Sequence, residues 1–347
     1  MRAFIFPLVF LSPLAWAAEA FTWSNPLPFS YTEGQTEARR EIRDPCIIRE
    51  GDTWHLVFTM WPFRNREESR LDEPDNGGSP GIAMVSSKDL KEWKFRKWLV
   101  KSADLPADSP YKNRFWAPEI HKLRGKFYLI FTADNWTNKE ANPAGTWGTA
   151  GYAFVGVADA VDGPYRHITY VEGAACDTGL FEGADGKTYA VIPRHHIDVQ
   201  EIDLSGIERG EVKLLGKPVT VVSADNRDIG VAATPEYLEG PWVERIGGKY
   251  HLFYAAFHKD PAFPDWTGYH TGVAVSDNPL GPFRKDTRGR VFTGGHLSVF
   301  DGPDQRKWFA YRGETENGAR GLLAIDPLEI SPEGRVETKA PTRGTQR

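Results

Sequence analysis

Five segments of the chain each begin with a residue type suited to acid–base chemistry or to binding a polar ligand. They begin at Asp44, at Trp116 in a segment that runs to Glu119, at Asp177, at Glu239 and at His296. Three of the five lead residues are carboxylates that lie far apart in the sequence. Carboxylates gathered in one pocket with shifted pKa values are typical of catalytic proton donors and acceptors. A fold that brings these residues together would therefore create a site for acid–base catalysis.

Each lead residue stands at the head of the same sequence pattern. A short mixed stretch follows, then a turn rich in Gly, Asp and Lys, then an aromatic-rich strand, as in residues 116–131 and 239–254. The five copies begin at positions 57 to 72 residues apart. Two alternating segments around such a turn predict a β-hairpin in each copy.

A second pattern follows the first, with clear copies that open with Gly81, Gly156 and Gly272 and weaker copies at 199–204 and 321–325. Two hairpins make each unit a four-stranded sheet. Five such units predict an all-β fold, a five-bladed β-propeller. The alternative is a β-sandwich whose strands resemble one another by chance. In a propeller the first strand of each blade lines the central channel, so we expect the five lead segments to converge there.

The composition agrees with this architecture. Gly contributes 34 and Pro 25 of the 347 residues, which is too much for long helices. The hydrophobic share of 40% excludes a disordered chain, and the net charge of −5 argues against nucleic-acid binding. Cys46 and Cys176 cannot build a disulfide framework, and the sequence leaves open whether they are bridged or free.

The first 20 residues have the pattern of a secretory signal peptide. Arg2 precedes an apolar run over residues 3–16, and small-x-small cleavage patterns end at Ala17 and Ala20. The alternative is a membrane anchor, but the run is short and contains Pro7 and Pro13. We expect residues 21–347 to form one propeller domain that is secreted or periplasmic and does not bind a membrane.

At the five lead segments the chain resembles glycoside hydrolase family 43, over a stretch from about Asp44 to Pro327. The motifs that carry the resemblance are Arg43-Asp44-Pro45, Trp116-Ala117-Pro118-Glu119, Asp177 in an Asp-x-x-Leu-Phe segment, Glu239-Gly240-Pro241 and Gly295-His296. The resemblance implies inverting hydrolysis of an O-glycosyl bond. Asp44 would be the general base, Glu239 the general acid, and Asp177 the residue that raises the pKa of the acid. Inversion needs room for water, so the Asp44 and Glu239 carboxyls should lie about 6.5–9.5 Å apart.

The resemblance also bears on His296 and Glu119. The family His that matches His296 lies on the channel axis and often touches a water or a calcium ion. No cofactor is required, and a calcium ion at His296 would be structural and mostly water-ligated, because calcium prefers six to eight oxygens. The alternative is a buried water. Glu119 is expected to be a substrate-binding residue; the family usually has Asp at this position, which leaves the subsite geometry in the second unit open.

Several other residues are expected to bind the sugar. Trp116 lies beside a channel strand and Trp61 follows the second strand of the first unit, and sugar rings stack on such flat side chains. The resemblance adds Arg320, whose alternative is a surface salt bridge. Of the adjacent pair His195 and His196, which point to opposite faces of a strand, at most one reaches the substrate, and we assign His195.

Two insertions, at residues 62–80 and 132–149, are expected to cover the pocket mouth and favour exo action, unless they are only surface loops.

The resemblance leaves the sugar open among arabinofuranosides, xylosides, arabinans and galactofuranosides. We expect an arabinofuranosidase or xylosidase that acts on an oligo- or polysaccharide. The alternatives are a galactofuranosidase of the same family and a carbohydrate-binding propeller without catalysis, which would lack one of the three carboxylates. A retaining fructosidase would carry an Asn-Asp-Pro-Asn start, which Arg43-Asp44-Pro45-Cys46 lacks, and a seven-bladed interaction propeller would need more residues. The oligomeric state is left open.

Overall fold

The computed structural model describes residues 21–27, 41–61, 79–143, 151–194, 196–223, 238–258, 268–286, 291–313 and 322–346. The predicted signal peptide, residues 1–20, lies outside the described residues and stays a prediction. Within the described part, no helix is long and apolar enough to cross a membrane.

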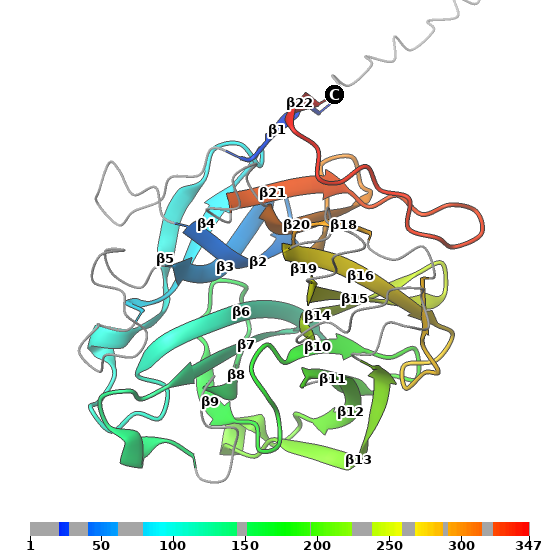
Figure 1. Cartoon of the computed structure of the whole chain (residues 1–347). Helices are drawn as coiled ribbons and strands as arrows, with labels where there is room; N and C mark the ends of the chain where they lie inside the picture. Colours follow the sequence, from blue (N-terminus) through cyan, green and yellow to red (C-terminus); the bar gives the residue numbers. More distant parts are fainter. Residues whose placement is uncertain are drawn as a thin grey trace, which may run out of the picture.

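Five antiparallel sheets surround a central axis, so the predicted five-bladed β-propeller is confirmed (Figure 1). Blade 1 contains β2 (Glu41–Glu50), β3 (Thr53–Trp61), β4 (Gly81–Ser87) and β5 (Lys94–Lys101). Blade 2 contains β6 (Asn113–Leu123), β7 (Lys126–Asp134), β8 (Tyr152–Ala158) and β9 (Arg166–Tyr170). Blade 3 contains β10 (Gly179–Glu182), β11 (Thr188–Pro193), β12 (Ile197–Asp203) and β13 (Lys213–Val222).

Blade 4 contains β14 (Leu238–Ile246), β15 (Lys249–His258), β16 (Gly268–Ser276) and β17 (Arg284–Lys285), and β18 (Phe292–Thr293) also pairs with β16. Blade 5 contains β19 (Gly295–Asp301), β20 (Lys307–Gly313) and β21 (Leu322–Pro327). The first strand of each blade lies nearest the middle of the molecule, as Figure 1 shows for β2, β6, β10, β14 and β19. Three short 3-10 helices lie between strands, at Ser102–Asp104, Lys139–Ala141 and Ile207–Arg209.

A bulge interrupts four of the five inner strands at the same height. In β2, Arg43 pairs with Thr59 and Cys46 pairs with Val57, so the inner strand carries one extra residue. The same shift occurs in β6 between 116 and 119, in β14 between 239 and 242, and in β19 between 295 and 298. Bulges of this kind bend a strand and re-aim a side chain.

One residue at each bulge has the left-handed backbone conformation. The φ angle is 54° at Asp44, 43° at Ala117, 52° at Gly240 and 47° at His296, and Asp177, just before β10, has φ 61°. A non-glycine residue in this region costs about 1–2 kcal/mol, so the surrounding structure must impose it. We call these five residues, one per blade, the bulge ring.

Blade 5 differs from the predicted four-stranded unit. Its sheet has three strands among the described residues. Residues 23–27, near the N-terminal end of the described chain, lie against its outer strand. The Leu27 N–H donates to the Leu323 carbonyl at 2.8 Å, and the Asn25 side chain both donates to and accepts from the backbone of Ile325, at 2.7 and 3.0 Å. The sequence of blade 5 did not reveal this edge because it comes from the other end of the chain.

The same segment joins the two ends of the described chain. β1 (Trp23–Asn25) pairs with β22 (Gly344–Gln346), and the buried Asp326 carboxylate accepts hydrogen bonds from Trp23, Asn25, Tyr311 and Thr342. Residues from blade 5 and from both ends of the described chain thus meet at one carboxylate.

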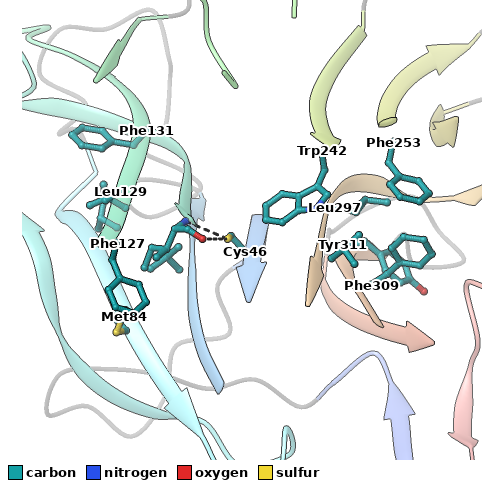
Figure 2. Close-up of a cluster of buried hydrophobic side chains, with 14 of the residues drawn as sticks. Cys46, Met84, Phe127, Leu129, Phe131, Trp242, Phe253, Leu297, Phe309 and Tyr311 are labelled. Atoms are coloured by element: carbon teal, nitrogen blue, oxygen red, sulfur yellow. Dashed lines mark hydrogen bonds between the residues drawn. The ribbon is translucent and has the colours of Figure 1, made fainter. Parts of the chain in front are cut away.

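Hydrophobic side chains fill the spaces between blades. Figure 2 shows one cluster in which Cys46 lies between blade 2 side chains such as Phe131 and Leu129 and side chains of blades 4 and 5 such as Trp242 and Phe309. The Cys46 thiol faces the backbone of Ile120 rather than a second sulfur. Both cysteines are free, which settles the question that the sequence left open.

Candidate active site

Three side chains of the bulge ring meet on the axis. His296 Nδ1 lies 3.0 Å from Asp44 Oδ1 and 3.8 Å from Asp177 Oδ2. The three side chains belong to blades 1, 3 and 5 and are 12% exposed or less. Bulges in β2 and β19 re-aim Asp44 and His296, and Asp177 reaches the same group from the segment just before β10. The predicted convergence of Asp44, Asp177 and His296 is therefore observed.

Burial and mutual charge both shift the pKa values of this group. Burial alone would raise the pKa of Asp44, but His296, then Thr59 and Arg43, hold that pKa below its usual value. Burial raises the pKa of Asp177, and the negative charge of Asp44 adds to the rise. Burial alone would lower the pKa of His296, but Asp44 and Asp177 raise it to about 10. At neutral pH Asp44 and His296 thus form a buried ion pair.

Threonine side chains brace the ring from the neighbouring strands. Thr59 Oγ1 donates to Asp44 Oδ2 at 2.6 Å and accepts the Ala117 N–H at 2.7 Å. One blade further on, Thr132 Oγ1 accepts the Asp177 N–H at 3.2 Å. Each threonine thus ties the inner strand of the next blade to its own blade. Sequence reasoning missed both, although the Phe-Thr pairs at 58–59 and 131–132 repeat at matching positions.

Glu239 precedes the ring residue of blade 4 and pairs with Ala255 of β15. Its negative charge contributes to the raised pKa values of His296 and Cys176, which places it near this group. The next residue, Gly240, packs directly against His296. A β-carbon on Gly240 would lie 2.6 Å from Cγ of the imidazole, so no larger residue fits without moving the ring. The Gly240 N–H also donates to the Asp177 carboxylate.

Glu119 lies buried in the channel wall. Its Oε2 lies 2.7 Å from His121 Nε2, and the His121 ring stacks on Trp242 at 5.0 Å between centroids. Burial raises the pKa of Glu119 against the opposing effect of His121. Glu119 and His121 alternate on β6 and therefore share a face, which is the sequence signal that could have revealed the pair. The sugar contact expected for Glu119 stays a prediction.

The other predicted sugar-binding residues are only partly described. Trp116 is half-buried in β6 and pairs with Thr132. Trp61 ends β3, but its side chain lies outside the described residues, as do His195 and Arg320. These four assignments therefore stay predictions.

The two insertions predicted from the sequence are only partly described by the structure. Residues 62–78 and 144–150 lie outside the described part of the chain, so their position over the mouth stays a prediction. The second insertion, expected from residue 132, begins only at Asn135. Residues 132–134 continue β7, because Asp134 pairs with Asn113 and Ala133 pairs with Tyr152.

A charged and aromatic cluster at the end of β7 was not anticipated. Arg114 forms an ion pair with the buried Asp134 carboxylate through two nitrogens. Its guanidinium lies 4.1 Å from the centroid of Trp136, a geometry typical of a cation–π contact. Burial lowers the pKa of Arg114 and Cys176 opposes that shift, so the cluster lies within electrostatic range of Cys176.

A bound ion at His296 stays a prediction. The Nε2 atom of His296 is buried and has no hydrogen-bond partner among the described residues. No group of three or more His, Cys, Asp or Glu side chains in the described part of the chain is arranged to hold a metal ion. One nitrogen fits a water, or an ion whose other ligands are waters, better than a calcium site built by protein.

The fold and the site together define a β-propeller with a buried acid–base centre on its axis. The family model of Glycosyl hydrolases family 43 matches residues 38–336. The chain belongs to this family, as the motifs had indicated.

Individual relatives are distant. The extracellular exo-α-(1→5)-L-arabinofuranosidase of Cellvibrio japonicus is 25% identical over 289 residues, which cover 77% of this chain and 73% of that protein. A xylosidase/arabinosidase of Butyrivibrio fibrisolvens is 25% identical over 228 residues, which cover 61% of this chain and 36% of that protein. This chain thus spans about a third of the Butyrivibrio protein. The crystal structure of a thermostable family-43 glycoside hydrolase superposes with a TM-score of 0.68 at 23% identity and covers 94% of this chain and 98% of that one.

Proposed function

We propose that the chain is a secreted, inverting glycosidase that removes arabinofuranosyl or xylosyl units from an oligo- or polysaccharide. Asp44 is the general base, Glu239 the general acid, and Asp177 the residue that tunes and orients the acid. The observation that supports this most is the buried contact of Asp44 with His296 and Thr59, because it favours an ionised and oriented base.

The contacts of Asp44 suit a base that acts on water. Oδ1 accepts from His296 and Oδ2 accepts from Thr59, so one donor holds each oxygen. A carboxylate has about four lone-pair sites, so room remains for a hydrogen bond from a water molecule. Asp44 takes one proton from this water as the oxygen attacks the anomeric carbon. A lowered pKa keeps Asp44 ionised below neutral pH, at the cost of some basicity.

The leaving group departs on the opposite face of the sugar. Glu239 gives its proton to the glycosidic oxygen as the bond to the anomeric carbon breaks. The negative charge of Asp177 favours the protonated form of Glu239 before the reaction. Afterwards Asp44 carries the proton and Glu239 is ionised, and exchange with solvent restores both.

The sugar and the location of the enzyme come from the relatives and the sequence. One relative is named an exo-arabinofuranosidase and another a xylosidase/arabinosidase, which supports a pentose at the cleaved end. The name of the first includes "extracellular", which supports cleavage of residues 1–20 as a signal peptide. The insertion at 62–80 and the loop that begins at Asn135 would close the site for exo action.

Substitution of the two proposed catalytic carboxylates tests the assignment on a panel of aryl arabinofuranosides, xylosides and galactofuranosides. We expect Asp44→Asn to abolish turnover of every substrate that the wild type cleaves. Glu239→Ala should lower kcat by about 100-fold or more for a poor leaving group, since general acid catalysis contributes about 10²–10⁴-fold, and much less for an activated one. Turnover by Asp44→Asn, or full activity of Glu239→Ala on a poor leaving group, would refute the corresponding role.

A further inference from the structure

Asp177 is braced differently from Asp44, although the two occupy matching positions in the bulge ring. In blade 1, the Thr59 hydroxyl donates directly to the Asp44 carboxylate. The matching Thr132 hydroxyl instead accepts the Asp177 N–H at 3.2 Å. The donor to the Asp177 carboxylate is the Cys176 thiol, which lies 3.0 Å from Oδ1. A cysteine thus supplies at Asp177 the hydrogen bond that a threonine supplies at Asp44.

We propose that Cys176 is a positioning residue for catalysis, whose thiol donates to Asp177 Oδ1 and fixes the carboxylate beside His296 and Gly240. This inference rests on the role proposed for Asp177 above. The other contacts of the carboxylate are the Gly240 N–H and His296, 3.8 Å from Oδ2. Among the described residues, the thiol is the side chain that donates a hydrogen bond to Oδ1, so rotation of the carboxylate becomes easier without it.

The surroundings of Cys176 keep its thiol in the form that can donate. Burial raises the pKa of the Cys176 thiol, and the neighbouring Asp177 raises it further. The thiol therefore stays protonated at neutral pH, and its hydrogen is available to the carboxylate. The negative charge of Glu239 also raises the pKa of Cys176, so the thiol lies close to the proposed acid as well.

Three variants and two leaving groups test this role. Cys176→Ala removes the donor, Cys176→Ser keeps it, and Cys46→Ala is the matched control. Cys46 is also a buried free cysteine, but its sulfur hydrogen-bonds backbone atoms of Ile120 rather than a carboxylate. The measurements are kcat and KM on an aryl glycoside with a poor leaving group and on one with an activated leaving group.

We expect Cys176→Ala to lower kcat by roughly tenfold on the poor leaving group, in line with loss of a hydrogen bond to a charged group. KM should change by less than about twofold, and the activated substrate should lose little, because it does not need the acid. Cys176→Ser should restore kcat, and Cys46→Ala should stay near wild type. If Cys176 had only a structural role, its loss would lower kcat equally on both substrates, and the effect would not depend on a hydrogen-bond donor at this position.

Wild-type kcat of Cys176→Ala on the poor leaving group, or failure of Cys176→Ser to restore it, would overturn the inference. Asp177→Asn separates this from the proposed function. If Asp177→Asn abolishes turnover while Cys176→Ala does not, only the role of Cys176 is wrong. If Asp177→Asn is fully active, the role proposed for Asp177 is refuted, and so is the role proposed for Cys176.

Discussion

At the scale of single residues, the site depends on backbone conformations that L-amino acids rarely adopt. Asp44, Asp177 and His296 all have positive φ, and each would point elsewhere in a regular strand. The motifs around them predicted which residues meet. The bulges could not be read from the sequence, because only one of the five ring residues is the glycine that usually marks such a conformation.

Gly240 offers a test at this scale. In Gly240→Ala the new methyl group would lie 2.6–2.8 Å from three atoms of the His296 ring, which must then move away from Asp44. We expect kcat to fall by about 100-fold, the loss typical of a misplacement near 1 Å.

Gly248→Ala is the matched control for Gly240→Ala. Gly248 lies in the β14–β15 turn at φ 84° with nothing within 4 Å of an added β-carbon. This variant should lose about 1 kcal/mol of stability and retain wild-type kcat. Equal activity of the two variants would show that His296 need not stay where it is.

At the scale of elements, the sequence repeats predicted most of the strands of the blades correctly but not the outer edge of blade 5. The hairpin pattern repeats because each blade packs against its neighbours in the same way, with an aromatic second strand and a Gly-rich turn. Among the described residues, blade 5 has three strands, and Asn25 and Leu27 hydrogen-bond its outer strand. No local pattern records such a contact across 300 residues of sequence. The Glu119–His121 pair was found only in the structure, because the sequence motif ends at Glu119 and the shared strand face was not considered.

Trp23 tests the closure of blade 5. Its ring is buried and lies 4.7 Å from the ring of Trp308, edge to face, while its Nε1–H donates to Asp326. We expect Trp23→Ala to lower the free energy of unfolding by about 3–5 kcal/mol, measured by chemical denaturation. Ser24→Ala, the next residue along β1, should change it by less than about 0.5 kcal/mol. Similar values for both variants would mean that the segment adds nothing to stability.

At the scale of the whole molecule, the propeller brings the inner strand of each blade to the centre, so side chains from different blades can form one site. The proposed base, its histidine partner and the proposed acid with its modulator come from blades 1, 5, 4 and 3. No disulfide links them, since both cysteines are free, so packing and hydrogen bonds between the blades fix the distances between these groups. An inverting enzyme uses this rigidity to hold two carboxyls far enough apart for one water molecule.

The central claim is that Asp44 and Glu239 act from opposite faces of the sugar in one displacement. Proton NMR of the reaction, with the aryl glycoside that the wild type cleaves best, records the anomer formed first, before mutarotation. The proposed mechanism predicts the anomer of inverted configuration. First formation of the anomer with retained configuration would contradict it, because that outcome requires a covalent intermediate and carboxyls only about 5–5.5 Å apart.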